Sequence, residues 1–98
     1  MNGESAQVYI LHFDQPYWKT CQHYVGYTRV GVDERLKVHR AGNGSKLVKY
    51  AMNHGINFSL VKVEDFDSIG EARQRERQIK KRGGGGKLCP ICNRWRAI

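Results

Sequence analysis

The sequence contains no long apolar run. A membrane-spanning helix needs roughly eighteen or more consecutive apolar residues, and none of the 98 residues belongs to such a run. The N-terminus lacks the basic and apolar segments of a secretory signal, so we expect a cytoplasmic protein without a membrane partner. Cysteine is scarce: the odd set of Cys21, Cys89 and Cys92 is not a disulfide framework and fits a reducing compartment.

Acidic residues are few, with 9 Asp and Glu against 17 Lys and Arg and a formal net charge of +8. The excess is concentrated in residues 70–98, which contain nine basic and two acidic residues, whereas residues 1–69 contain eight and seven. Such a basic stripe indicates a polyanionic partner. Nucleic acid is the first expectation, an acidic membrane surface the second, and a merely solvated charged face the third.

The hydrophobic pattern predicts three strands in one globular domain with a modest core. Residues 7–13 are apolar on both parities and rich in aromatic and β-branched residues, which is typical of a central strand. Residues 23–28 predict a second strand that forms a hairpin with the first. Residues 58–66 predict a third, and a change of apolar parity within it indicates a bulge.

Three helices are expected between and after these strands. Residues 33–40 and 45–52 predict two short helices. A Ser-x-x-Glu capping box at residues 68–71 begins the third, which should run to about Arg82. The four glycines at 83–86 end it and predict a flexible link to a short tail.

One carboxylate falls on the side of the third helix that should face the core. Ile69, Ala72 and Ile79 form the apolar stripe of this helix, and Glu76 lies in the middle of it. An unpaired buried charge is costly, so this glutamate needs a partner. A structural ion pair with an arginine and a metal ion explain it equally well.

Four other polar positions admit a functional or a structural interpretation. Arg35 and His39 share one face of the first helix, where the histidine is either an ordinary core residue or, with the arginine fork beside it, part of a phosphate site. Tyr9 and Tyr24 lie in the middle of two predicted strands. Periodicity alone makes them core residues with satisfied hydroxyls.

Together these positions resemble the GIY-YIG endonuclease family, over residues 7 to about 82. The matching positions are residues 8–10 (Val-Tyr-Ile), 24–28 (Tyr-Val-Gly-Tyr-Thr) and 42–46, Arg35, His39, and the helical segment 71–81 with Glu76. The order and spacing of the motifs carry the resemblance more than any one of them. It implies a small stand-alone α+β domain, a three-stranded antiparallel sheet flanked by helices, at residues 1–82. Residues 83–98 would then be a Gly-rich link and a basic tail containing a CxxC motif.

The resemblance also implies an enzyme, a hydrolase that cleaves phosphodiester bonds in DNA, with RNA left open as a substrate. Glu76 would ligate one Mg²⁺ or Mn²⁺ ion. Tyr9 and Tyr24 would position or deprotonate the attacking water, Arg35 would neutralise charge on the phosphate, and His39 would shuttle a proton or orient a neighbour. Repair, restriction, mobile-element and phage roles all stay open, as does a catalytically silent nucleic-acid-binding module, and a small zinc-dependent interaction protein is a third class.

The tail carries a second candidate metal site. Cys89 and Cys92 form a Cys-Pro-x-Cys motif, which is half of a zinc knuckle, and Cys21, His23 or a second chain would have to complete the four ligands. A bare thiol pair is the alternative. The family often has an asparagine after the glutamate, and Asn93 is the one candidate for it in this chain.

Basic residues on the third helix and beyond should contact nucleic acid mainly through phosphates. The candidate contacts are Lys46, Arg73, Arg77, Lys80, Lys81, Arg82, Arg94 and Arg96.

Overall fold

The structure is a computed structural model that describes residues 5–16, 22–42 and 44–93, apart from the side chains of Lys87 and Asn93. The described elements are, in chain order, β1 (Ala6–Phe13), β2 (His23–Thr28), α1 (Val32–Arg40), α2 (Lys46–Asn53), β3 (Phe58–Phe66), α3 (Ile69–Lys81), a 3₁₀ helix η1 (Gly84–Leu88) and α4 (Pro90–Asn93). The sequence predicted the three strands and the three longer helices to within about two residues. Among the described helices, none is long and apolar enough to cross a membrane.

The strands form one antiparallel sheet in the order β2-β1-β3, so the fold is α+β with β1 in the centre, as predicted. The expected bulge is present. Ile10 pairs with Lys62 and Leu11 with Leu60, which leaves Val61 of β3 as the extra residue. The bulge explains why the apolar parity of the third strand changes along its length.

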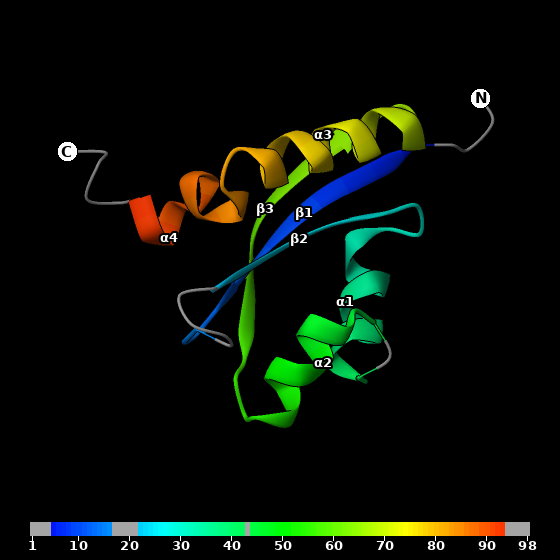
Figure 1. Cartoon of the computed structure of the whole chain (residues 1–98). Helices are drawn as coiled ribbons and strands as arrows, with labels where there is room; N and C mark the ends of the chain where they lie inside the picture. Colours follow the sequence, from blue (N-terminus) through cyan, green and yellow to red (C-terminus); the bar gives the residue numbers. More distant parts are fainter. Residues whose placement is uncertain (1–4, 17–21, 43, 94–98) are drawn as a thin grey trace.

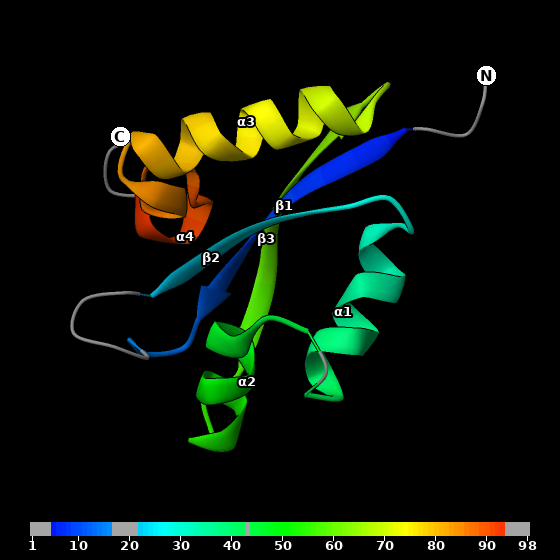
Figure 2. The ribbon, with the colours of Figure 1, turned by 45° about the vertical axis from the view of Figure 1, so that its right-hand side comes forward.

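The sheet separates two helical layers, which lie on opposite sides of it in Figures 1 and 2. On one side, Tyr9, Leu11 and Phe13 of β1 pack with Val48 of α2 in a core that also includes the start of α1. On the other, the alternate residues of β1 pack with Val25, Ala72 and Ile79, which joins β1 and β2 to α3. Because successive side chains of a strand point to opposite faces, β1 contributes to both cores.

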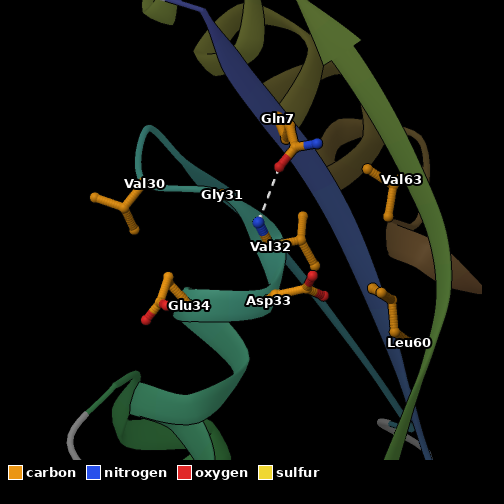
Figure 3. A pocket seen from close by; sticks show the side chains of 8 residues that line it. All are labelled: Gln7, Val30, Gly31, Val32, Asp33, Glu34, Leu60 and Val63. Carbon is orange, nitrogen blue, oxygen red and sulfur yellow. Dashed lines mark hydrogen bonds between the residues drawn. The ribbon is translucent and has the colours of Figure 1, made fainter.

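The start of α1 is fixed to the central strand rather than capped by its own side chain. Gly31, with a φ of 95°, turns the chain into the helix, and Gln7 Oε1 accepts a hydrogen bond from the Val32 amide at 2.9 Å. Figure 3 shows this bond beside a hollow of about 520 Å³. Asp33 and Glu34 line that hollow, so its charge does not suit a polyanion.

The third helix is anchored at its start and along its side. Ser68 Oγ accepts a hydrogen bond from the Glu71 amide at 3.2 Å, which confirms the predicted N-cap. Arg75 makes a two-pronged ion pair with Glu64 of β3, with Nε to Oε1 at 2.7 Å and Nη2 to Oε2 at 3.1 Å. These contacts fix how α3 is rotated on the sheet, and hence where Glu76 lies.

The prediction of a flexible glycine link was wrong. Gly84, Gly85 and Gly86 belong to η1, which packs against β2. A Cβ added to Gly85 would lie 2.6 Å from Cγ2 of Ile10, closer than real Cβ contacts come. The glycines therefore allow the backbone to lie directly on the sheet, a use of glycine that composition alone does not distinguish from flexibility.

Candidate active site

Four of the predicted catalytic residues come together from three elements. The hydroxyl of Tyr9 on β1 and Nε2 of His39 on α1 share a hydrogen bond of 2.8 Å, and both residues are fully buried. The ring of Tyr24 on β2 lies against both, with centroid distances of 6.2 Å to Tyr9 and 5.5 Å to His39. Arg35, one helical turn before His39, lies close enough to Tyr9 to act on the pKa of its hydroxyl. We call Tyr9, Tyr24, Arg35 and His39 the tyrosine cluster.

Two glycines make room for this cluster. A Cβ on Gly26 would lie 2.6 Å from the Tyr9 hydroxyl and 2.8 Å from Cε2 of Tyr24, because both rings lie across the backbone of β2 at this point. A Cβ on Gly44 would overlap Nδ1 of His39. The glycine that follows Tyr24-Val25 therefore has a local steric role, and any side chain there would displace the phenols.

Arg35 connects the buried cluster to an open surface. It lines a hollow of about 490 Å³ together with Tyr27 of β2 and Ile69 and Arg73 of α3. Nε of Arg35 is buried and has no hydrogen-bond partner within the described part of the chain. A guanidinium with an unused donor can bind an oxygen anion. Because the Arg35 side chain lines the hollow beside edge strand β2, an anion would reach it from there.

Glu76 lies one helical turn after Arg73, on the same side of α3 as Ile69 and Arg73, which line this hollow. Its side chain is only 15% exposed, and the carboxylate pairs with Lys80 at 3.4 Å. Arg75, the neighbouring arginine, is already paired with Glu64. The sequence left open whether Glu76 pairs with an arginine or binds a metal ion. Among the described residues, its ion-pair partner is Lys80 at the helix surface, not an arginine. An exposed lysine is a partner that a divalent cation can displace.

Comparison with known proteins identifies the family of this chain. The model of the GIY-YIG catalytic domain matches residues 6–87. The chain belongs to the GIY-YIG family. No curated protein and no solved structure gives a significant match. GIY-YIG domains are nucleases, and nucleases of this family act on DNA with divalent metals. The match extends beyond the end of α3 into the glycine segment, to residue 87.

Burial changes the acid–base properties of two cluster residues of this GIY-YIG domain. It raises the pKa of Tyr9 to about 12, although the nearby guanidinium of Arg35 acts in the opposite direction. Burial also lowers the pKa of His39 to about 4, and the charge of Arg35 adds to this effect. At neutral pH, Tyr9 is therefore a protonated phenol and His39 a neutral imidazole, so one ring nitrogen is a proton acceptor.

We expect the stability of the domain to fall as the pH is lowered from about 6.5 to about 4. In this window the unfolded chain protonates His39 and the native protein does not, so the unfolded state binds more protons and is favoured by acid. Above about 6.5 the histidine is neutral in both states and contributes no pH dependence. The measurement is the free energy of unfolding in urea at several pH values.

His39→Gln should flatten this dependence, whatever it does to stability at pH 7. The matched control is His54→Gln, because His54 is exposed at the end of α2 and should leave the slope unchanged. An unchanged slope in His39→Gln would show that other groups are responsible for acid destabilisation.

The remaining predicted contacts lie outside the cluster. Lys46, Arg73, Arg77, Lys80, Lys81 and Arg82 are all exposed, the last five along α3 and its end. Arg94, Arg96 and Cys21 lie outside the described residues, as does the side chain of Asn93. Cys89 and Cys92 lie on the opposite face of the sheet from the tyrosine cluster, beside His12 and His23. Sequence analysis had considered His23 as a ligand and had missed His12.

Proposed function

We propose that this chain is a DNA endonuclease that hydrolyses phosphodiester bonds with one Mg²⁺ or Mn²⁺ ion at Glu76. The observation that carries the proposal is the tyrosine cluster, in which Tyr9 and His39 share a buried hydrogen bond beside Arg35. Arg35 lines a hollow together with Arg73, which lies one helical turn before Glu76 on α3. A core has no need for a phenol, an imidazole and a guanidinium in mutual contact, whereas phosphoryl chemistry uses all three.

The donor set at Glu76 fits a hard cation. Carboxylate oxygen is a ligand that Mg²⁺ and Mn²⁺ prefer, and Mg²⁺ commonly binds through one or two carboxylates while keeping several waters. Glu76 would hold the ion, and water and phosphate oxygens would complete its coordination. When bound, the metal supplies charge stabilisation to the phosphate undergoing attack and to the leaving oxygen.

Arg35 would bind the scissile phosphate. It lies beside the Tyr9 hydroxyl, and its buried Nε has no hydrogen-bond partner among the described residues, so it has a donor to offer a phosphate oxygen. Arg73 lies across the hollow and can contact a neighbouring phosphate oxygen. The arginine pair would hold the DNA backbone between α1 and α3.

Tyr9 and His39 would together remove the proton of the attacking water. A phenol with a pKa of about 12 is a poor base at neutral pH, but Tyr9 can accept the water proton while it donates its own to Nε2 of His39. A phosphate bound to Arg35 would neutralise the charge that lowers the pKa of His39, so the imidazole becomes a better acceptor when substrate is present. Tyr24 packs against both rings and holds this pair in place.

The direct experiment is cleavage of supercoiled plasmid, single-stranded DNA and branched DNA by the purified chain. Mg²⁺ or Mn²⁺ should be omitted and added back rather than removed with a strong chelator, because such a chelator would also strip a zinc ion. We expect cleavage only after the ion is restored. Tight binding without cleavage under every metal condition would favour the catalytically silent nucleic-acid-binding module instead.

Replacing Arg77 and Lys81 by alanine should weaken DNA binding similarly for unrelated sequences. Both side chains are exposed on α3, one turn apart, whereas Lys80 is paired with Glu76. Each phosphate contact contributes about 0.9 to the slope of log K against log salt on duplex DNA, so loss of two contacts should flatten the slope by up to about 1.8. Fluorescence anisotropy at several salt concentrations, on two unrelated duplexes, measures it.

The matched control is the pair Lys37→Ala and Lys49→Ala, which removes two exposed lysines from α1 and α2. This variant has the same net charge as the test variant and should keep most of the slope. Equal slopes in the two variants would mean that DNA affinity depends only on the total charge of the protein. A loss on one duplex alone would mean that α3 contacts bases.

A further inference from the structure

A second polar cluster lies on the face of the sheet opposite to the tyrosine cluster. His12 of β1 and His23 of β2 are direct partners in the antiparallel register, so their side chains point to the same face. Cys89 and Cys92 reach them from the end of the chain, Cys89 fully buried and Cys92 exposed. One ligand atom from each of the four residues lies within 4.8 Å of every other. We call these four residues the His-Cys cluster.

We propose that the His-Cys cluster binds one structural Zn²⁺ ion, with Nδ1 of His12, Nε2 of His23 and the sulfurs of Cys89 and Cys92 as its four ligands. Two thiolates and two imidazoles are a common ligand set of structural zinc sites. With all four positions taken by protein, no position remains open for water or substrate. The site is separate from the metal proposed at Glu76, and it does not depend on the nuclease proposal.

Four of the six distances between the ligand atoms match a tetrahedron around zinc. With Zn–N of about 2.0 Å and Zn–S of about 2.3 Å, two nitrogens should lie about 3.3 Å apart and a nitrogen and a sulfur about 3.5 Å apart. The two histidine nitrogens are 3.2 Å apart. Nδ1 of His12 lies 3.5 Å from the Cys89 sulfur and 3.6 Å from that of Cys92, which is 3.4 Å from Nε2 of His23.

Hydrogen bonds alone explain this cluster poorly. Nδ1 of His12 faces three polar atoms at once, namely Nε2 of His23 and the two sulfurs. A ring nitrogen carries either one proton or one in-plane lone pair, so it can satisfy only one of them well. A cation at the centre would satisfy all four atoms together, because each can donate a lone pair to it.

The path of the backbone through the glycine segment brings the two cysteines next to the histidine pair. Gly83 and Gly84 have φ values of 102° and 81°, which turn the chain out of α3, and Gly85 packs directly onto Ile10. A Cβ on Gly86 would lie 3.7 Å from the ring of His23. The glycine segment thus runs along the sheet to the histidine pair, and the cysteines follow within six residues.

The ion would tie the end of the chain to β1 and β2. Such a link closes loops of more than sixty residues, between His12 or His23 and Cys89, and so restricts the unfolded chain. It also fixes the place where the basic tail with Arg94 and Arg96 begins. The zinc would therefore support both the stability of the domain and the position at which the tail leaves it.

The test is metal analysis of the full chain, purified from zinc-supplemented cells and dialysed. We expect about one zinc per chain by mass spectrometry. Cys92→Ser should lower zinc affinity by at least about tenfold, since even indirect partners of a zinc ion contribute that much, and should lower the melting temperature. Cys92 is the variant of choice because it is exposed, whereas a change at buried Cys89 could prevent folding for other reasons.

Two matched controls establish the ligand set. Cys21→Ser removes the remaining thiol of the chain and His54→Gln an exposed histidine, and both should keep zinc. Zinc retained in Cys92→Ser, or lost equally in Cys21→Ser, would overturn the proposed ligands. Glu76→Ala should keep zinc whether or not it cleaves DNA, which separates this result from that of the nuclease assay.

Cobalt provides a readout that a purely structural effect of the mutations would not give. Co²⁺ added to the metal-stripped chain should produce the visible bands and thiolate charge-transfer absorption of a tetrahedral site, and Cys92→Ser should weaken the charge-transfer absorption. A folded wild-type chain that holds no zinc and gives no tetrahedral cobalt spectrum would overturn the proposal and leave the His-Cys cluster as a hydrogen-bonded group.

Discussion

Glu76→Ala is expected to lower the rate of DNA cleavage about a thousandfold or more while DNA affinity stays the same or rises slightly. A bound metal contributes several kcal/mol to the stabilisation of a phosphoryl transition state, and each 1.4 kcal/mol or so is a factor of ten in rate. Affinity should not fall, because the substitution removes a negative charge beside the exposed arginines of α3. Single-turnover cleavage and anisotropy titrations measure the two quantities separately.

The matched control is Glu71→Ala, which makes the same change on the exposed first turn of α3. It should cleave at close to the wild-type rate. A folded Glu76→Ala protein that cleaves at a normal rate would refute the assignment of the metal to this carboxylate. A loss of rate in both variants would point to the position of the helix rather than to a metal ligand.

Tyr9→Phe is expected to reduce the single-turnover rate about 100- to 10,000-fold, the range typical of a general acid or base. The substitution keeps the ring in its core and removes the hydroxyl that hydrogen-bonds Nε2 of His39 and lies beside Arg35. Its structural cost is about 1–3 kcal/mol, because buried Nε2 of His39 is left without this partner, and each kcal/mol lowers the melting temperature of a domain of this size by about 4–8 °C. The rate should therefore change far more than the stability.

Tyr50→Phe is the control, because Tyr50 is an exposed tyrosine on α2 outside the tyrosine cluster. Its rate and its melting temperature should both stay near those of the wild type. If Tyr9→Phe cleaves as fast as Tyr50→Phe, the phenol is only a core residue with a satisfied hydroxyl. The same comparison with Tyr24→Phe shows whether the second phenol takes part in proton transfer or only packs.

Local patterns were sufficient to predict most elements of this fold. The strand at 58–66 and the start of α3 follow from side-chain alternation and from one N-cap serine, which are interactions between near neighbours in the chain. The bulge at Val61 could be inferred because it shifts the apolar alternation of a single strand. Such features depend on short segments, and the sequence displays those segments directly.

Long-range contacts were predicted less well. Nothing in the spacing of His12 and His23 shows that strand register makes them neighbours, or that Cys89 lies above them. The glycines of η1 were misjudged because their contact, Ile10, is some seventy residues earlier in the chain. The tyrosine cluster was found through a family resemblance, since periodicity alone assigned Tyr9 and His39 to the core.

Strand β1 presents Tyr9 to one face of the sheet and His12 to the other, three positions apart in a single run of extended chain. Point substitutions can alter either side chain without touching the other. Inserting or deleting one residue before Tyr9 is a different matter, because the rest of the strand would then have to slip in register or exchange its two sides. The length of this eight-residue strand is therefore constrained by the residues on both faces of the sheet. Insertions and deletions should be tolerated in the connections around the strand but not within it.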